Sequence, residues 1–413
     1  MTSLRPRDAT SASSRDRVAI ALIVLAGTTR LVAALALGDT FHFVDETFYV
    51  DAARHLLAGE GFGAGYRNVP AQPLWLAVLA APWPERLVWL RAAHAIAVGV
   101  LGGTALHALG TRLLGGAATR IALGFYALDP LLVVAGGLLY PEASATVMLI
   151  ATLLAAVIAS ERDDARATAA SGVLLGFTAL FRPVAIVLVP VFVIWIATVA
   201  ATAAQRRLVH ALAFAIACGL GVAPWAVSNL MRHGDVVPTG MAGLQNAPVS
   251  KQDIGNRGLA GSLAHQTMAT PTTLAKRVVR ELGHFWEPYP TRLTTDHPVG
   301  RTKLHALDSR LPQQTTFSPG IRDVVSALSY GVEMTLAFVG LVLAGRGRRA
   351  AIVLIVAVAL AYGFGYALFV AKLRYRIVVM PGIFLLAGLG VLLLRARLGA
   401  TASDVVAAAE RRA

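Results

Sequence analysis

Cysteine is nearly absent from this chain of 413 residues, because Cys218 stands alone in an apolar run. A single cysteine excludes an intrachain disulfide. Charge is also scarce. Asp, Glu, Lys and Arg make up 15% of the residues, whereas a soluble chain of this length carries about a quarter. Hydrophobic residues make up 56%. This composition excludes an ordinary soluble domain and is typical of a chain that lies mostly in lipid.

Acidic residues are the scarcer charged group, with 23 Asp and Glu against 37 Lys and Arg, a formal net charge of +14. A strongly basic chain raises the question of nucleic-acid binding. The basic residues here form no continuous stripe. They stand in short clusters between apolar runs, as the positive-inside rule expects of membrane proteins. We therefore expect membrane lipids as partners and no nucleic acid.

The apolar runs are about twenty residues long, the length that crosses about 30 Å of hydrocarbon. They predict an all-α polytopic membrane protein, a single bundle of about ten transmembrane helices over residues 18–395 with two large outer loops. The predicted spans are 18–38, 87–111, 118–138, 142–160, 167–181, 183–203, 207–225, 323–344, 350–371 and 376–395.

Arginine placement orients these spans. The tail 1–17 contains four arginines and is expected to be cytoplasmic. Alternation then places the tail 396–413 and five further basic clusters on the same side. The clusters are Arg112 with Arg120, Arg162 with Arg166, Arg206 with Arg207, Arg346 to Arg349, and Arg395 with Arg397. We expect a multi-pass protein of the cell membrane, in a bacterium the cytoplasmic membrane, with a site that faces outward.

Two outer loops are large, at about 39–86 and 226–322. In the first loop, Asp45 is expected to N-cap a short helix that runs through Leu57 and ends at Gly59. The next segment, 73–83, is apolar but too short to cross. It is expected to lie in the interface, with Trp75 and Trp83 at headgroup level.

The acidic pair Asp45–Glu46 is the most informative feature of the chain. It follows the first span within a few residues and precedes about 350 residues that are mostly hydrocarbon-compatible. Paired carboxylates at the mouth of a membrane bundle suggest acid/base or metal chemistry on a substrate carried by a lipid. We predict Asp45 and Glu46 as catalytic residues.

The same predicted side gathers other charges. Glu142 begins the fourth span, Arg182 follows the fifth, and Lys372, Arg374 and Arg376 stand between the last two. Three cations on the outer side break the positive-inside pattern. Arginine forks and lysine point charges suit phosphate oxygens. We therefore predict the four cations as substrate-binding residues, and Glu142 with them because it lies on the same side.

Structural explanations stand beside the functional ones. Asp45 and Glu142 can each serve only a helix start, and Arg182 can snorkel from a helix end. Arg30 and Asp129 lie within predicted spans, where charged residues usually face the bundle and find a partner. They can pair with each other or line a cavity.

Six segments, in this order, resemble the GT-C superfamily of membrane glycosyltransferases, and in particular the branch of protein O-mannosyltransferases and the lipid A aminoarabinose transferase. The first-loop acidic pair followed by a short helix is the strongest of them. The segments are 45–62, Gln72 to Trp75, Tyr140 to Glu142, Leu180 to Pro183, Pro224–Trp225 with Asn229, Gly234 and Val237–Pro238, and Arg374 to Arg376.

The resemblance implies transfer of one sugar from a polyprenyl-phosphate donor to a hydroxyl of a glycan, glycolipid or protein acceptor, with inversion. Asp45 would be the general base, and Glu46 would orient it or take part in binding. Glu142 would bind the acceptor or a divalent cation. The sequence is compatible with a divalent cation but does not require one. We predict no certain cofactor and assign no residue as a metal ligand. Arg182, Lys372, Arg374 and Arg376 would hold the lipid phosphate.

Three other functions remain open at the level of sequence. A transporter or lipid flippase of envelope precursors would use Arg30 and Asp129 along its path, and it predicts paired broken spans. A membrane enzyme that ligates or polymerises glycans would also use outer-loop charges. A non-catalytic assembly subunit would tolerate the loss of Asp45.

Overall fold

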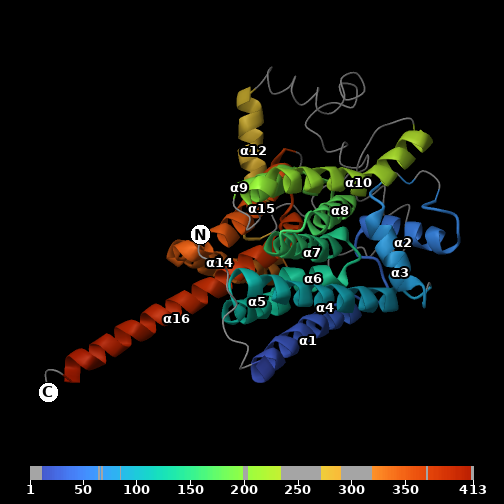
Figure 1. The fold of residues 1–413 in the computed structure, drawn as a ribbon. Helices are drawn as coiled ribbons and strands as arrows, with labels where there is room; N and C mark the ends of the chain where they lie inside the picture. The colour runs from blue at the N-terminus through green and yellow to red at the C-terminus, as the bar shows by residue number, and fades with distance from the viewer. Residues whose placement is uncertain are drawn as a thin grey trace.

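The computed structural model describes residues 12–63, 66, 68–83, 85–198, 203–233, 271–289, 319–368 and 371–410. All regular structure in these ranges is helical. Figure 1 shows α2 and α3 gathered at one end of the bundle, while the last part of α16 projects from the other end. The all-α fold class predicted from the sequence is confirmed.

Seven helices are long and apolar enough to cross a membrane. They are α1 (Ala12–Leu37), α4 (Leu87–Leu113), α7 (Pro141–Arg162), α10 (Arg207–His233), α14 (Pro319–Leu343), α15 (Arg349–Ala367) and α16 (Met380–Glu410). Each overlaps one of the ten predicted spans; α4, α7 and α10 contain theirs completely.

The other three predicted spans are helical but differ from simple crossings. The span at 118–138 is broken into α5 (Gly116–Leu128) and α6 (Pro130–Gly137), which are bent by 56°. Pro130 cannot continue the preceding helix, and Asp129 caps the new one by accepting from the Leu132 N–H at 2.6 Å.

Two predicted spans are shorter apolar helices. They are α8 (Ala165–Phe181) and the 3-10 turn η2 (Pro183–Val187) with α9 (Leu188–Thr198). Among the described residues, length and composition thus support seven crossings, or eight with the bent pair. This is fewer than the ten expected.

Charged contacts at one end of the bundle support the predicted alternation. Arg112 at the end of α4 pairs with Glu161 of α7 at 3.4 Å, and Arg206 before α10 pairs with Asp163 after α7 at 2.5 Å. These basic clusters therefore share one end, opposite α2 and α3. That this end is cytoplasmic stays a prediction.

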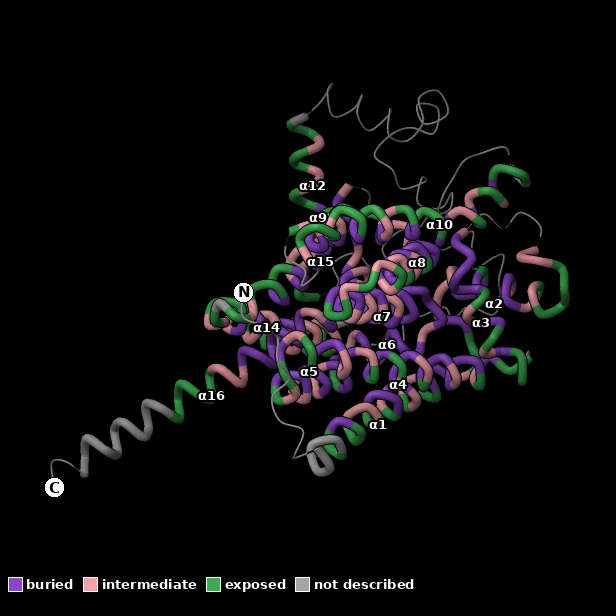
Figure 2. The backbone as a smooth tube through the Cα atoms, viewed as in Figure 1, coloured by how far each residue is buried: buried purple, intermediate pink, exposed green. Residues whose placement is uncertain are grey.

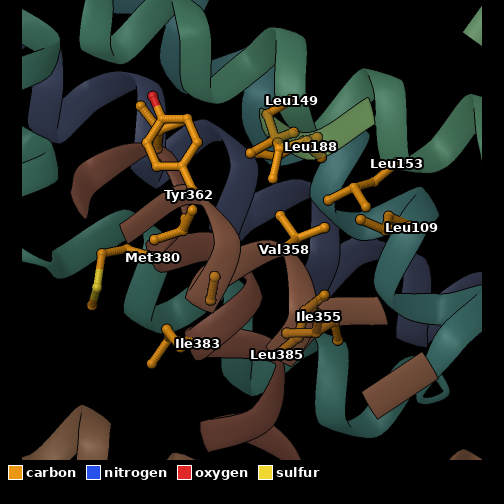
Figure 3. Close-up of a cluster of buried hydrophobic side chains, with 14 of the residues drawn as sticks. Leu109, Leu149, Leu153, Leu188, Ile355, Val358, Tyr362, Met380, Ile383 and Leu385 are labelled. Atoms are coloured by element: carbon orange, nitrogen blue, oxygen red, sulfur yellow. The ribbon is translucent and has the colours of Figure 1, made fainter. Parts of the chain in front are cut away.

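The interior of the bundle is apolar, and much of its outer surface is apolar as well. Figure 2 shows buried residues along the inward faces of α4, α7 and α8 and exposed residues along α1, α10 and α14. Many exposed side chains are large hydrophobics, such as Ile216 and Phe338. A chain that exposes such residues on all sides is built for a lipid solvent. At the centre, Leu109, Leu149, Val358 and Leu385 meet from α4, α7, α15 and α16 (Figure 3).

Small loop helices stand at the ends of the bundle. The helix α2 spans Val44–Leu57, and Gly59 follows with a φ of +77°, in agreement with the predicted end of this helix.

The interfacial segment forms α3 (Ala71–Ala80). Trp83 is 49% exposed and lies 6.5 Å from Trp89, whereas the Trp75 Nε1–H points inward and donates to His94 Nδ1 at 2.9 Å. In the second outer loop the described helix is α12 (Pro271–Phe285), whose Phe285 packs against α15.

Glycine sets the distance between α8 and α10. A Cβ atom on Gly172 would lie 2.3 Å from the carbonyl oxygen of Phe214, whereas one on Gly219 of α10 would meet nothing within 4 Å. Small residues let membrane helices approach closely, where packing rather than hydrophobicity drives association.

We therefore expect Gly172→Ala to lower stability by about 1–3 kcal/mol, because the added methyl group forces two backbones apart. The matched change Gly219→Ala should leave stability equal or slightly higher, since it removes a helix glycine without a clash. Thermal unfolding of both purified variants in detergent checks this. Equal midpoints would contradict the close approach.

Candidate functional site

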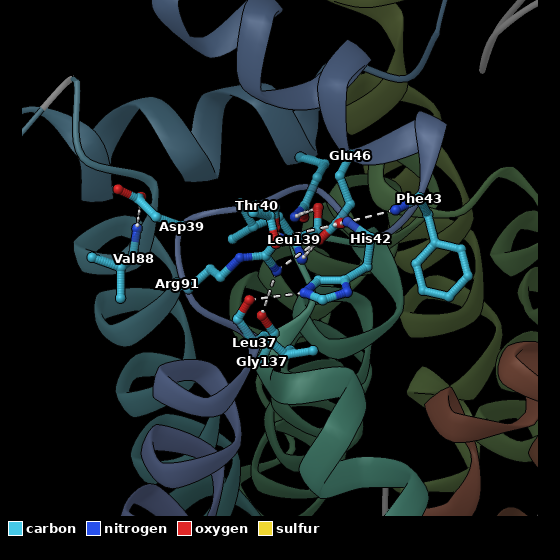
Figure 4. Close-up of polar contacts among 11 residues, drawn as sticks. Leu37, Asp39, Thr40, His42, Phe43, Glu46, Val88, Arg91, Gly137 and Leu139 are labelled. Carbon is cyan, nitrogen blue, oxygen red and sulfur yellow. Dashed lines mark hydrogen bonds and ion pairs between the residues drawn. The ribbon is translucent and has the colours of Figure 1, made fainter. Parts of the chain in front are cut away.

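Glu46 forms a buried ion pair with Arg91 of α4, with both side chains fully buried and Arg91 Nη1 2.8 Å from Glu46 Oε1 (Figure 4). The same carboxylate accepts from the N–H groups of His42 at 2.8 Å, Phe43 at 3.2 Å and Leu139 at 3.0 Å. Both oxygens of this carboxylate therefore accept hydrogen bonds from the protein itself.

Arg91 extends the same network to two loops. It donates to the carbonyl oxygens of Gly137 at 3.0 Å and Thr40 at 2.7 Å. The pair thus ties together the link from α1 to α2, the body of α4 and the link from α6 to α7. Sequence reasoning missed Arg91, although a charged residue in an apolar span is the signal that singled out Arg30 and Asp129.

The start of α2 differs from the prediction. The N-cap residue is Phe43 and not Asp45, and Glu46 at the third helical position returns its carboxylate to the Phe43 N–H. This is the acidic half of a capping box. Because Glu46 serves as the cap, Asp45 is left in the first turn with its side chain free to face the bundle mouth.

Asp45 meets Arg374 instead. Its Oδ2 accepts from Arg374 Nη2 at 3.2 Å, and the side chains are 49% and 26% exposed. Arg374 lies on η7 (Leu373–Val378), a 3-10 segment between α15 and α16. This contact joins the first outer loop to the segment between α15 and α16, 329 residues away in sequence.

Glu142 and Arg182 complete the cluster. Glu142 lies in the first turn of α7 after Pro141, and only 2% of its side chain is exposed. Arg182, the residue that ends α8, forms an ion pair with it. Arg374 Nε lies 3.1 Å from Glu142 Oε1, so Arg374 bridges the two carboxylates. We call Asp45, Glu142, Arg182 and Arg374 the four-charge cluster.

Aromatic rings surround the cluster. The Arg374 guanidinium lies 4.2 Å from the centre of the Tyr140 ring, and that of Arg182 lies 5.0 Å from Tyr375. Burial raises the pKa of Tyr49 and Tyr140, so both hydroxyls stay protonated. The cluster therefore balances two cations against two carboxylates within an aromatic wall.

In the part of the chain that the structure describes, the other two predicted cations form no contact with the four-charge cluster. Arg376 is 2% exposed, donates from Nη1 to the carbonyl oxygen of Glu287, and lies 3.7 Å from the centre of the Tyr330 ring of α14. It faces away from the four-charge cluster, which it was predicted to join. The Lys372 side chain is half-buried and, among the described residues, has no ion pair or hydrogen bond, whereas the Lys372 carbonyl oxygen accepts from the Tyr375 N–H at 2.9 Å.

The buried charges of the spans also have partners. Arg30 donates to the carbonyl oxygens of Ala26 at 2.9 Å and Tyr126 at 2.8 Å and lies over the Tyr126 ring. Asp129 caps α6. These contacts are structural. Of the residues that carried the resemblance, Gly234, Val237 and Pro238 lie outside the described residues.

Solved structures share the fold of this chain. The chain superposes on the oligosaccharyltransferase AglB from Archaeoglobus fulgidus, in complex with an inhibitory peptide and a dolichol-phosphate, with a TM-score of 0.55. The match has 10% identity and covers 96% of this chain and 52% of that one. A complex of the same enzyme with Zn and sulfate gives 0.54 at 13% identity and covers 95% and 51%. The chain has the GT-C fold of membrane glycosyltransferases and spans about half the length of these structures.

The family comparison points the same way. Residues 75–227 match the model of dolichyl-phosphate-mannose-protein mannosyltransferases. No curated protein sequence matches the chain. The resemblance to GT-C glycosyltransferases is confirmed.

We expect Arg91→Met to destabilise the protein by about 3–5 kcal/mol, because it leaves the Glu46 carboxylate buried without its counter-charge. Arg54→Met is the matched control. Arg54 pairs with Asp51 at 3.8 Å on the exposed side of α2, so its loss should cost less than about 1 kcal/mol. Thermal unfolding in detergent compares the two variants. An Arg91 variant as stable as the Arg54 variant would contradict the structural role.

Proposed function

We propose that this protein is a membrane glycosyltransferase that moves a sugar from a polyprenyl-phosphate donor to an acceptor hydroxyl. The observation that carries the proposal is the four-charge cluster at one end of a membrane bundle. In it the half-exposed Asp45 pairs with Arg374, and the buried Glu142 pairs with both Arg374 and Arg182. The family match and the GT-C fold support the same reaction class.

Asp45 is the general base in this proposal. Its carboxylate is the most exposed acidic group of the cluster, so an acceptor hydroxyl can reach it. It removes the hydroxyl proton as that oxygen attacks the anomeric carbon. A positioned base contributes about 10²- to 10⁴-fold. Glu46 acts through position, because its cap and its pair with Arg91 fix the first turn of α2.

Arg182 and Arg374 hold the donor phosphate. The bond from the anomeric carbon to the phosphate oxygen breaks as the new glycosidic bond forms, and the phosphate gains a negative charge. Fixed guanidinium groups stabilise charge that develops on a leaving group. Attack and departure on opposite faces of the sugar give inversion in a single displacement. Lys372 is a third candidate for the phosphate, whereas the contacts of Arg376 favour a role in the fold.

Glu142 positions the two arginines through its ion pairs with both. A divalent cation at Glu142 and Asp45 is not favoured by their surroundings, since each carboxylate already has a guanidinium partner. Among the described residues, no three His, Cys, Asp or Glu side chains gather as a metal site.

The site faces outward in this proposal, because the arginine-rich end opposite α2 and α3 is predicted to be cytoplasmic. The donor enters from the bilayer beside α3, where Trp83 and Trp89 are half-exposed. A glycan, glycolipid or protein acceptor would approach from the outer side.

A transporter is the second function to weigh, because a broken span at Asp129 is typical of transport paths. Inverted-repeat transporters carry such breaks in corresponding positions of both halves. Among the described residues, one bent pair is found. The four-charge cluster lies at the end of the bundle, whereas transport sites lie near the bilayer midplane. Both observations favour the transferase.

We expect Asp45→Asn to lower sugar transfer by about 10²- to 10⁴-fold with an unchanged fold, because the amide cannot take the proton. The assay uses purified protein with a panel of polyprenyl-phosphate sugars and candidate acceptors. Asp51→Asn, on the exposed side of the same helix, is the control and should retain full transfer. Equal transfer by Asp45→Asn and wild type would remove Asp45 from the mechanism.

A further inference from the structure

Arg374 holds the proposed base and is also a proposed phosphate ligand. Its Nη2 donates to Asp45 Oδ2 at 3.2 Å, while its Nε lies 3.1 Å from Glu142 Oε1 and its guanidinium lies over the Tyr140 ring. A carboxylate oxygen that accepts from a guanidinium is less available to an incoming hydroxyl. The structure therefore pairs the proposed base with one of the groups proposed to bind the donor.

We propose that Arg374 masks Asp45 until the donor binds, and that the donor phosphate releases the base by taking the Nη2 contact for itself. This inference rests on the proposed function and adds an order of events to it. The donor must bind first, because an acceptor that arrives earlier finds its base in an ion pair.

The geometry makes the exchange local. Arg374 remains held by Glu142 through Nε and by the Tyr140 ring, so only its outer nitrogen needs a new partner. Arg182 is less suited to the exchange. It is 13% exposed, lies against the 2%-exposed Glu142, and ends a helix. Arg182 is thus fixed against Glu142, whereas Arg374 reaches the half-exposed Asp45.

The charges of the reaction drive the same exchange. The donor is a phosphodiester with one negative charge. When the bond from the anomeric carbon to oxygen breaks, the bonding electrons go to the phosphate, which becomes a monoester with about two charges. The acceptor proton passes to Asp45, which becomes neutral. Asp45 therefore loses its attraction for Arg374 as the phosphate gains attraction, so the transition state favours the exchanged partner.

Competition between Asp45 and phosphate is the measurable consequence. If both compete for Arg374, removing the Asp45 charge must tighten the binding of a lipid phosphate. The probe is undecaprenyl phosphate, titrated against the protein of 413 residues in nanodiscs. The proteins compared are wild type, Asp45→Asn, Arg374→Gln and the double variant, with Asp51→Asn as the charge-matched control.

We expect Asp45→Asn to bind undecaprenyl phosphate about two- to fivefold more tightly than wild type, the range for a partly exposed ion pair. Asp51→Asn should bind like wild type. Arg374→Gln should bind more weakly, and adding Asp45→Asn to it should restore nothing, because the two effects act through one contact.

Three outcomes overturn the exchange. Asp45→Asn can bind equally or more weakly, which assigns the pair a structural role. It can gain the same factor in the Arg374→Gln background, which assigns the gain to general charge. Asp51→Asn can also show the same gain in affinity as Asp45→Asn, which again assigns the gain to general charge. If Arg374→Gln does not fold, Arg374→Lys supplies the second background, in which the gain should shrink because lysine lacks the fork. Absence of binding in wild type would overturn the proposed donor, whereas binding without competition would overturn only the exchange.

Discussion

The buried pair of Glu46 and Arg91 is the contact on which the site depends. It closes the start of α2, holds the link into α7, and fixes both against α4. Removing two charges from water is costly, and only near-complete hydrogen bonding offsets that cost. Here the carboxylate accepts from three backbone N–H groups in addition to the arginine. With Glu46 committed to the fold, its neighbour Asp45 is directed to the mouth of the bundle.

The four-charge cluster follows a different rule. Its members come from α2, the start of α7, the end of α8, and η7. Two positive and two negative charges make the cluster neutral as a set. Neutrality allows four ionised groups to stand at the edge of a membrane bundle without a counter-ion. One member, Asp45, is half-exposed, whereas Glu142 is almost fully buried. The cluster therefore has a fixed inner part and an outer part that a substrate can reach.

Hydropathy predicted the helices well, because a hydrocarbon solvent leaves few alternatives to helix. It did not predict the break at Asp129, where a proline and a capping carboxylate act locally. The sequence also grouped Asp45 with Glu46 and Arg374 with Arg376. In each case the structure separates the two, since neighbours on a helical turn face different sides. Spacing of one or two residues does not reveal which of the pair enters the site. Arg91 carries the same sequence signal as Arg30, a charge within an apolar span, but spacing does not identify Glu46, 45 residues away, as its partner.

The length of α8 has a consequence for the lipid around it. Its 17 residues rise about 26 Å, which is less than the roughly 30 Å of a typical hydrocarbon core. A span that falls short is accommodated by local thinning of the bilayer. Arg182 stands at the end of this helix. Where α8 crosses, the thinner bilayer would bring the phosphate groups of the lipids closer to the Arg182 guanidinium.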